Sequence, residues 1–232
     1  MGTMGYGYGS EFHLLRWMGR HRELLTAKVE DATGLERIRW LDFEFDCRKD
    51  IPDSELKGLN FLKEDGHYDD VMSAYTLGKI SWPQRGEQMN WDAVGISGDT
   101  YILCEAKAHV EEIERKHDPG NSASIGQRER AFSFAKNVVG AKKDADWMRN
   151  FYQMANRLYI LALLKKCNVK AVLLNMYFCG DKFPNGNYVC PRTPEEWRPI
   201  IREEFSVLGL PENCDFVRTY IKEVFLPVSI KK

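Results

Sequence analysis

The distribution of apolar positions predicts a helix, a strand and an unassigned stretch in the first part of the chain. Residues 10 to 34 place apolar side chains on one face at helical spacing, with Ser10 as a favourable N-cap and Gly34 as a stop, so we predict one helix there. Residues 37 to 46 alternate with period two, which is typical of a strand. The mixed pattern of residues 47 to 87 gives no assignment.

The middle of the chain predicts a hairpin that is followed by two helices and a strand. The Gly98-Asp99 dipeptide is a hairpin turn signal, and the runs on either side of it, residues 90 to 96 and 101 to 107, have the composition of strands. Helical patterns then cover roughly residues 127 to 139 and 145 to 166, and the next apolar run predicts a strand at residues 170 to 180.

The last part of the chain predicts a helix and a strand. Thr193 is a good N-cap and Pro194 suits the first helical position, and this helix should end near Gly209. Residues 215 to 228 predict a final strand. The order of helices and strands indicates a mixed α/β fold.

Composition and charge narrow the class of protein. The chain has 33 Lys and Arg against 34 Asp and Glu, so its formal net charge of -1 gives no global positive field, although a local basic patch remains compatible with it. The six cysteines form no CxxC pair, which does not favour a zinc site. With neither a secretory signal pattern nor an apolar run of about eighteen residues, we expect a cytoplasmic, reduced protein with no membrane partner. The oligomeric state is open, and a homodimer is one alternative.

Domain organisation is expected to be simple. No repeat or shift in composition marks a boundary, so we expect a single domain over residues 10 to 232. Residues 1 to 9 are rich in glycine and are expected to be poorly ordered.

Two carboxylates and a lysine are expected to converge in the predicted hairpin. If Gly98 and Asp99 form the turn, the register places Asp92 opposite Glu105, and alternation puts Lys107 on the same face as Glu105. Like charges in this position disfavour folding by about 0.2–1 kcal/mol, so something should compensate. Lys107 supplies one positive charge, and a divalent cation held by the carboxylates would supply the rest, with Mg²⁺ as the expected ion and Mn²⁺ as a substitute.

The alternative is that this pair lies on a solvated sheet face with Lys107 as an ordinary ion-pair partner, which is what such a short pattern more often indicates. The flanking residues argue against it, because both strands consist mainly of residues that are usually buried: Trp91, Ala93, Val94, Ile102, Leu103, Cys104 and Ala106. A carboxylate pair in strands that are buried on both faces is usually functional.

The segments NWDAVG and YILCEAK resemble the D-x(n)-(D/E)-x-K signature of the restriction-endonuclease-like PD-(D/E)XK nuclease superfamily. Asp92 stands thirteen residues before Glu105, and the E-A-K triplet matches, whereas Asn90 and Trp91 stand where many members have a proline before the Asp. The resemblance implies an α-β-β-β-α-β core, a mixed central sheet flanked by helices, over about residues 10 to 180. A helix and a strand would be added in residues 181 to 232.

The resemblance also implies a metal-dependent nuclease that hydrolyses phosphodiester bonds in nucleic acid, with DNA as the expected partner. Mg²⁺ would be held by Asp92, Glu105 and the Ala106 carbonyl, while Lys107 would orient or help deprotonate the attacking water, or stabilise developing charge. Many members carry an acidic residue on the first core helix, and Glu11 is the candidate for this catalytic and metal-binding position. Alternatively, Glu11 only complements the helix dipole.

Further candidates lie on the predicted helices. Some members of the superfamily place a Gln beside the catalytic carboxylates, and Gln153 occupies a polar stripe on an otherwise apolar helix; alternatively it bonds backbone carbonyls. The candidate nucleic-acid contacts are basic residues, although such a run is also typical of a solvated helix face: Arg128, Arg130, Lys142, Lys143 and Arg157.

Two rival functions stay open at this point. One is a non-catalytic module that binds nucleic acid or protein on a nuclease-like fold, since a fold alone does not establish an activity. The other is an enzyme that uses the same carboxylates on another substrate, such as a nucleotide or RNA.

Overall fold

A mixed five-stranded sheet forms the centre of the molecule. The computed structural model describes residues 7–41, 56–63, 66–84, 89–114, 122–184, 186–211 and 213–230. The strands lie in the order β1-β4-β5-β6-β7, and β1, β4 and β5 run antiparallel while β5, β6 and β7 run parallel. Their bounds are β1 Arg39–Trp40, β4 Ala93–Ser97, β5 Thr100–Lys107, β6 Lys170–Cys179 and β7 Ile221–Pro227. The predicted α/β class with a mixed sheet is therefore confirmed.

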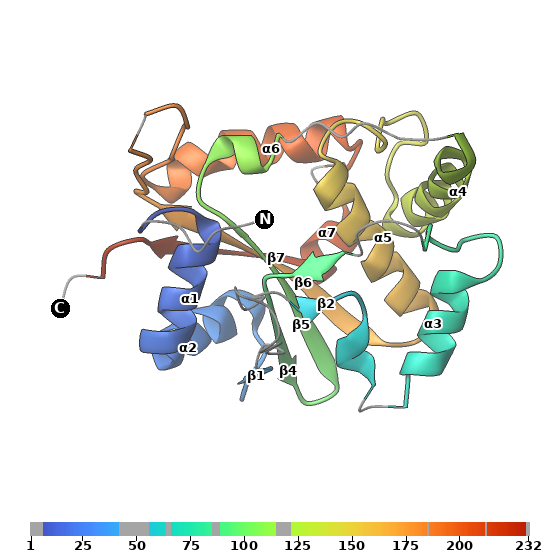
Figure 1. Ribbon diagram of the computed structural model, residues 1–232, viewed down its shortest axis with the longest axis horizontal. Helices are drawn as coiled ribbons and strands as arrows, with labels where there is room; N and C mark the ends of the chain where they lie inside the picture. The colour runs from blue at the N-terminus through green and yellow to red at the C-terminus, as the bar shows by residue number, and fades with distance from the viewer. Residues whose placement is uncertain are drawn as a thin grey trace, which may run out of the picture.

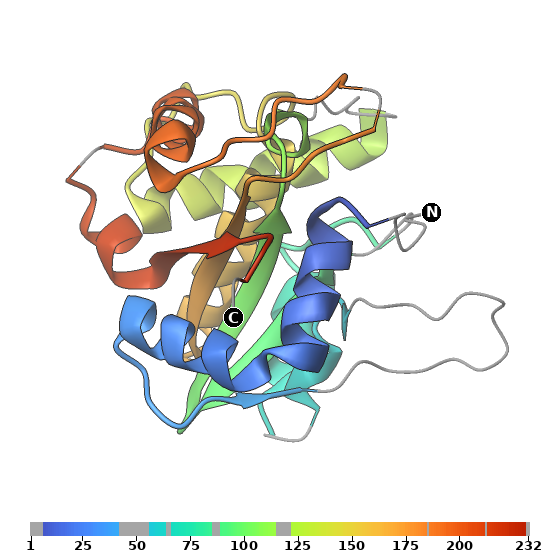
Figure 2. The same ribbon diagram turned by 90° about the vertical axis from the view of Figure 1, so that its left-hand side faces the viewer.

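Helices cover both faces of this sheet (Figure 1). One face carries α1 (Ser10–Arg20) and α2 (Arg22–Thr33), and the opposite face carries α4 (Ser122–Val139), α5 (Tyr152–Lys166) and α6 (Pro194–Val207). Figure 2, which looks at the α1 and α2 side, shows α6 above the sheet. Because side chains alternate along β5, Ile102 packs in the core under α1 and α2 while Leu103 packs in the core under α5.

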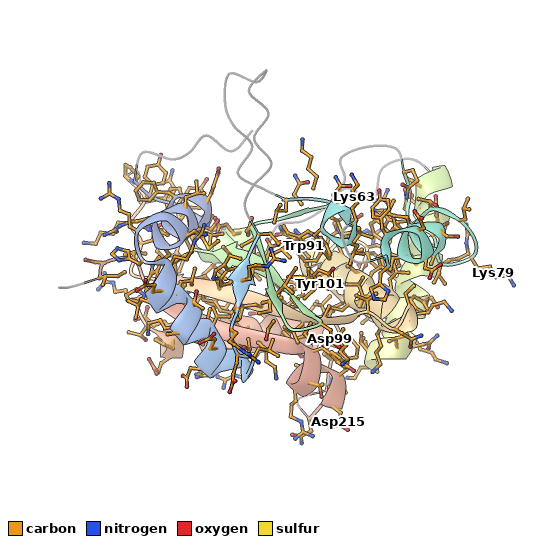
Figure 3. The ribbon with its side chains drawn as sticks, turned by 90° about the horizontal axis from the view of Figure 1, so that it is seen from below. Lys63, Lys79, Trp91, Asp99, Tyr101 and Asp215 are labelled. Atoms are coloured by element: carbon orange, nitrogen blue, oxygen red, sulfur yellow. The ribbon has the colours of Figure 1, made fainter. Side chains whose placement is uncertain are left out.

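The predicted β4–β5 hairpin has the predicted register. Ser97 pairs with Thr100 and Ala93 with Cys104, and Gly98 adopts φ 59°, a left-handed value that glycine tolerates. Asp99 lies at the tip of this hairpin (Figure 3). The register from which the sequence predicts that Asp92 faces Glu105 is therefore confirmed as far as the pair of Ala93 with Cys104.

The ladder stops at Asp92, which the sequence pattern does not predict. Asn90 and Trp91 form a separate strand, β3, that leaves the main sheet and pairs with β2 (Leu56–Lys57). The Trp91 indole Nε1 donates to the Gly58 carbonyl at 2.8 Å, which holds β3 in its new position. Among the described residues, no strand therefore pairs with the end of β5 on the β4 side.

Three other predictions about secondary structure are wrong in part. The helix expected over about residues 145 to 166 begins only at Tyr152, after Phe151 in a left-handed conformation (φ 51°). The helix expected over residues 10 to 34 is broken at His21, whose backbone (φ −135°, ψ 30°) is not helical. The expected strand over residues 215 to 228 begins instead as a short helix, α7 (Asp215–Tyr220), before β7. In α7, Phe216 and Tyr220 pack one turn apart with ring centroids 4.7 Å apart, which favours a helical turn over a strand.

The stretch without a sequence assignment contains short elements. A 3₁₀ turn, η1 (Asn60–Leu62), follows β2, and α3 (Tyr68–Thr76) packs against α5. A second 3₁₀ turn, η2 (Val110–Glu112), follows β5. Of the strand predicted at residues 37 to 46, residues 39 and 40 form β1, and residues 42 to 46 lie outside the described residues. Within the described ranges, no helix combines the length and apolarity that crossing a bilayer requires.

Candidate active site

The candidate site forms where β3 leaves the sheet. Ala106 N–H, which a continued ladder would pair with Trp91, donates to the Asp92 carboxylate at 2.6 Å instead. The N–H and C=O of one strand residue point toward the same neighbouring strand, so the Ala106 carbonyl faces the Asp92 side of β5 as well. The break in the ladder thus turns a strand edge into a place where carboxylate and carbonyl oxygens lie together.

Glu105 is the centre of a buried polar network. The side chain is 7% exposed, and its Oε1 accepts hydrogen bonds from Gln153 Nε2 at 2.6 Å and from the Lys107 ammonium. Gln153 Oε1 in turn accepts from Lys107 Nζ at 3.0 Å, which closes a three-residue ring. Lys107 and Glu105 project from the same face of β5, as predicted, and Gln153 reaches them from α5.

Arg157, one helical turn after Gln153, occupies the second oxygen of Glu105. Its Nε and Nη2 lie 2.9 and 2.8 Å from Glu105 Oε2, and Nη2 also donates to the Asn90 carbonyl at 2.6 Å. The guanidinium lies 4.5 Å from the centroid of the Trp91 ring. Arg157 therefore connects α5 to both β3 and β5. It is a buried residue of the site and does not lie on an outer surface.

Burial and like charge act on Asp92. Burial is the largest effect and raises the pKa of Asp92, and the neighbouring Glu105 carboxylate raises it as well. Lys107, the Ala106 N–H and Arg157 lower it, and the net pKa is about 8. Although the side chain as a whole is partly exposed, its carboxylate lies against Ala106 and the end of β5, so burial acts on the ionisable group itself. At neutral pH and without a cation, Asp92 is therefore mainly protonated.

Glu105 and Lys107 stay ionised. Burial raises the pKa of Glu105, but Arg157 and Lys107 outweigh this effect and hold the pKa below its ordinary value. Burial lowers the pKa of Lys107, but Glu105, Asp92 and Glu112 outweigh it, so its pKa lies above the ordinary value. The lysine is thus a fixed positive charge beside the carboxylates.

The donor set fits a hard divalent cation. Asp92, Glu105 and the Ala106 carbonyl supply oxygen ligands, and a cation would relieve the repulsion that helps to keep Asp92 protonated. One adjustment is required, because a carboxylate has about four lone-pair sites and Glu105 already faces four N–H donors. A cation would displace one of them, and the flexible Lys107 side chain is the most easily moved.

Known proteins give no further guide to this site. The chain matches no family model, no curated protein and no solved structure.

Of the residues predicted from the sequence, the structure brings together Asp92, Glu105, Ala106, Lys107, Gln153 and Arg157. Glu11 lies in the first turn of α1, which packs against the other face of β5. Next to it, the Ser10 hydroxyl donates to Glu112 Oε1 at 2.9 Å, which ties the start of α1 to the segment just after Lys107. A role for Glu11 at the metal stays a prediction.

The four other basic candidates do not form one cluster. Arg128 is 8% exposed and donates to the Tyr152 hydroxyl at 3.0 Å, so its guanidinium joins α4 to α5. Arg130, Lys142 and Lys143 are exposed. Arg130 lies within α4, and the two lysines follow the end of this helix. At a rise of 1.5 Å per residue, Arg130 is roughly 15 Å from the helix end that precedes the lysines. Contact of these residues with nucleic acid stays a prediction.

Two polar residues beside the site escaped the sequence argument. Asn175 pairs with Glu105 in the parallel register and is the only amide side chain in the run AVLLNMYF, which is a detectable signal. Glu204 shares the buried face of α6 with Trp197 and Ile201, at positions i, i+4 and i+7. A carboxylate on the apolar face of an amphipathic helix was the signal for Glu204.

Proposed function

We propose that this protein is a metal-dependent nuclease that hydrolyses phosphodiester bonds in nucleic acid, with DNA as the expected substrate. The observation that carries the proposal is the convergence of Asp92, Glu105 and the Ala106 peptide at the one point where the β4–β5 ladder opens. Two oxygen-rich groups with a lysine beside them fit the needs of hydrolysis at a phosphate.

Each residue has a definable part in that chemistry. Asp92, Glu105 and the Ala106 carbonyl would hold Mg²⁺, which when bound supplies Lewis acidity toward the phosphate and lowers the pKa of a water ligand. Lys107 has a raised pKa, which favours a charge-stabilising and hydrogen-bonding role over that of a base. Gln153 and Arg157 hold Glu105 from α5, and Gln153 also fixes Lys107.

The order of elements supports the same proposal. A helical layer (α1, α2), three antiparallel strands (β1, β4, β5), two helices (α4, α5) and a parallel strand (β6) follow the α-β-β-β-α-β order of the PD-(D/E)XK superfamily, which the motif resembles. On this proposal the fold is restriction-endonuclease-like, with α6, α7 and β7 added at the C-terminus. Agreement between motif and element order is stronger than either alone, although neither measures activity.

A metal-dependent cleavage assay tests the proposal. The protein should cleave plasmid, linear or single-stranded DNA with Mg²⁺ or Mn²⁺ and not with a chelator. Asp92→Asn should abolish cleavage, because the amide keeps the hydrogen bond from Ala106 but cannot supply an anionic ligand.

Two results would count against the proposal. Cleavage by Asp92→Asn at the wild-type rate would remove the assigned site. Binding of nucleic acid without cleavage of any substrate, RNA included, would favour the non-catalytic module.

A further inference from the structure

A small pocket lies beside Lys107, where β5, β6, α5 and α6 meet. It has a volume of about 20 Å³, which is room for one water molecule. Its lining includes polar residues of the candidate site and of β6 and α6, among them Glu105, Lys107, Gln153, Asn175, Tyr177 and Glu204. The parallel register accounts for this lining, because Asn175 and Tyr177 lie beside Glu105 and Lys107 and share their face of the sheet.

Asn175 has an unused donor in this pocket. The residue is 3% exposed, and its Nδ2 forms no hydrogen bond of good geometry with any described residue. The Tyr177 hydroxyl lies close enough to interact with the amide, but it can take only one of the two Nδ2 hydrogens and leaves the other without an acceptor. An unsatisfied buried amide N–H destabilises the folded state, so folded proteins usually give such a group a protein or water partner. Asn175 therefore indicates an acceptor inside the pocket.

Glu204 faces the same pocket from α6. The side chain is 5% exposed, and no hydrogen bond to its carboxyl group is formed by the described residues. Burial is the largest effect on its pKa and raises it, Glu105 and Glu223 raise it as well, and Lys107 lowers it, so that the net pKa is about 8. A water between Asn175 and Glu204 would satisfy both side chains, and it would lie next to the Lys107 ammonium, which has three N–H groups and bonds Glu105 and Gln153 with two of them.

We propose that Asn175 and Glu204 hold a water molecule in this pocket, and that Glu204 acts through it as a positioning residue that keeps Lys107 at the catalytic carboxylates. The catalytic part of this inference rests on the proposed nuclease function, whereas the water site does not. It gives the C-terminal extension a purpose in the site, because α6 would supply a group that the hairpin lacks.

The test compares Glu204→Leu with Glu204→Gln. The leucine variant should lose the water and lower the single-turnover cleavage rate about 10- to 100-fold, the usual cost of removing a group that orients a site residue, with Mg²⁺ affinity unchanged. The glutamine variant keeps a hydrogen-bonding side chain and should recover most of that rate. Glu203→Leu, at the neighbouring exposed position of α6, is the matched control and should cleave like the wild type.

Crystal structures of the wild type and of Glu204→Leu separate this inference from the proposed function. We expect a water bonded to Asn175 Nδ2 in the wild type, and in the variant we expect its loss together with movement of Lys107 away from Gln153. A wild-type pocket without water, or an unmoved Lys107 in the variant, would overturn the inference even if the protein is a nuclease. If Glu204→Leu does not fold, Asn175→Leu removes the other partner of the water and is judged by the same two observations.

Discussion

At the scale of single residues, Asp92 both ends a strand and supplies a carboxylate. Its side chain accepts the hydrogen bond from Ala106 that the next strand residue would otherwise accept, so the backbone can turn away without leaving that N–H unpaired. In this position the carboxylate is buried and lies near Glu105, and both effects raise its pKa, which is about 8. A local backbone feature thus sets the proton affinity of the proposed ligand.

This raised pKa predicts pH-dependent metal binding. Since the cation requires the ionised carboxylate, binding should release a proton from Asp92, and Mg²⁺ affinity should fall by up to about tenfold per pH unit as the pH drops below about 8. Calorimetry between about pH 6 and pH 9 would measure this. Asp92→Asn, which keeps the shape of the protonated acid, should lose most of the binding at every pH. An affinity that does not change between about pH 6 and pH 8 would contradict the assigned protonation state.

At the scale of elements, the C-terminal end of α6 is held against the α4–α5 connection by a close backbone approach. Gly209, just after α6, adopts φ 69°, and its carbonyl accepts from Lys142 N–H at 2.8 Å. A Cβ at this position would lie 2.8 Å from Lys142 Cβ and 2.9 Å from Ala145 Cβ. The Trp147 indole donates to the Leu208 carbonyl at 2.8 Å and fixes the same contact.

Gly209→Ala should therefore destabilise the protein more than a left-handed conformation alone would. We expect a loss of about 2–4 kcal/mol in the free energy of unfolding, from backbone strain plus the steric overlap with Lys142 and Ala145. Gly34→Ala is the matched control, because Gly34 has a similar φ of 71° but open space around it, and it should cost only about 1 kcal/mol. If urea denaturation gave the same loss of unfolding free energy for both variants, the contact of Gly209 with Lys142 and Ala145 would not be tight.

Local sequence signals were sufficient where neighbouring residues decide the structure. The Gly98-Asp99 turn and the alternation around it gave the hairpin register, and with it the convergence of Asp92, Glu105 and Lys107. The break at His21 could not be predicted, because contacts far along the chain accompany it: the Trp17 indole donates to the Pro227 carbonyl. Asn175 and Glu204 were missed for a similar reason, since their neighbours are set by parallel pairing and by the packing of α6.

At the scale of the whole molecule, the net charge of -1 requires that any binding of nucleic acid depend on local charge. The exposed candidates are Arg130, Lys142 and Lys143, on and just after α4. Within the site, the positive charges of Lys107 and Arg157 are already paired with Glu105. Attraction of a phosphate backbone would thus come from outside the site.

Salt dependence tests that surface. Binding of DNA should weaken steeply with salt, and replacing Arg130, Lys142 and Lys143 by Gln should reduce the slope of log affinity against log salt by about one for each phosphate that the protein no longer neutralises. The control variant replaces three other exposed arginines by Gln and so removes the same amount of positive charge: Arg20 in α1, Arg37 before β1 and Arg39 in β1. If the two variants change the slope equally, the basic residues around α4 form an ordinary solvated surface.

The central claim is that Asp92, Glu105 and Lys107 form a catalytic unit, and Lys107→Ala tests it most directly. The variant should keep Mg²⁺ binding, or bind more tightly because Glu105 is freed of one donor, while single-turnover cleavage falls about 100-fold or more. The measurement is the single-turnover rate, taken with the metal affinity and melting temperature of the same preparation. A lowered melting temperature with a preserved cleavage rate would contradict the account, because Lys107 would then be only a structural partner of Glu105.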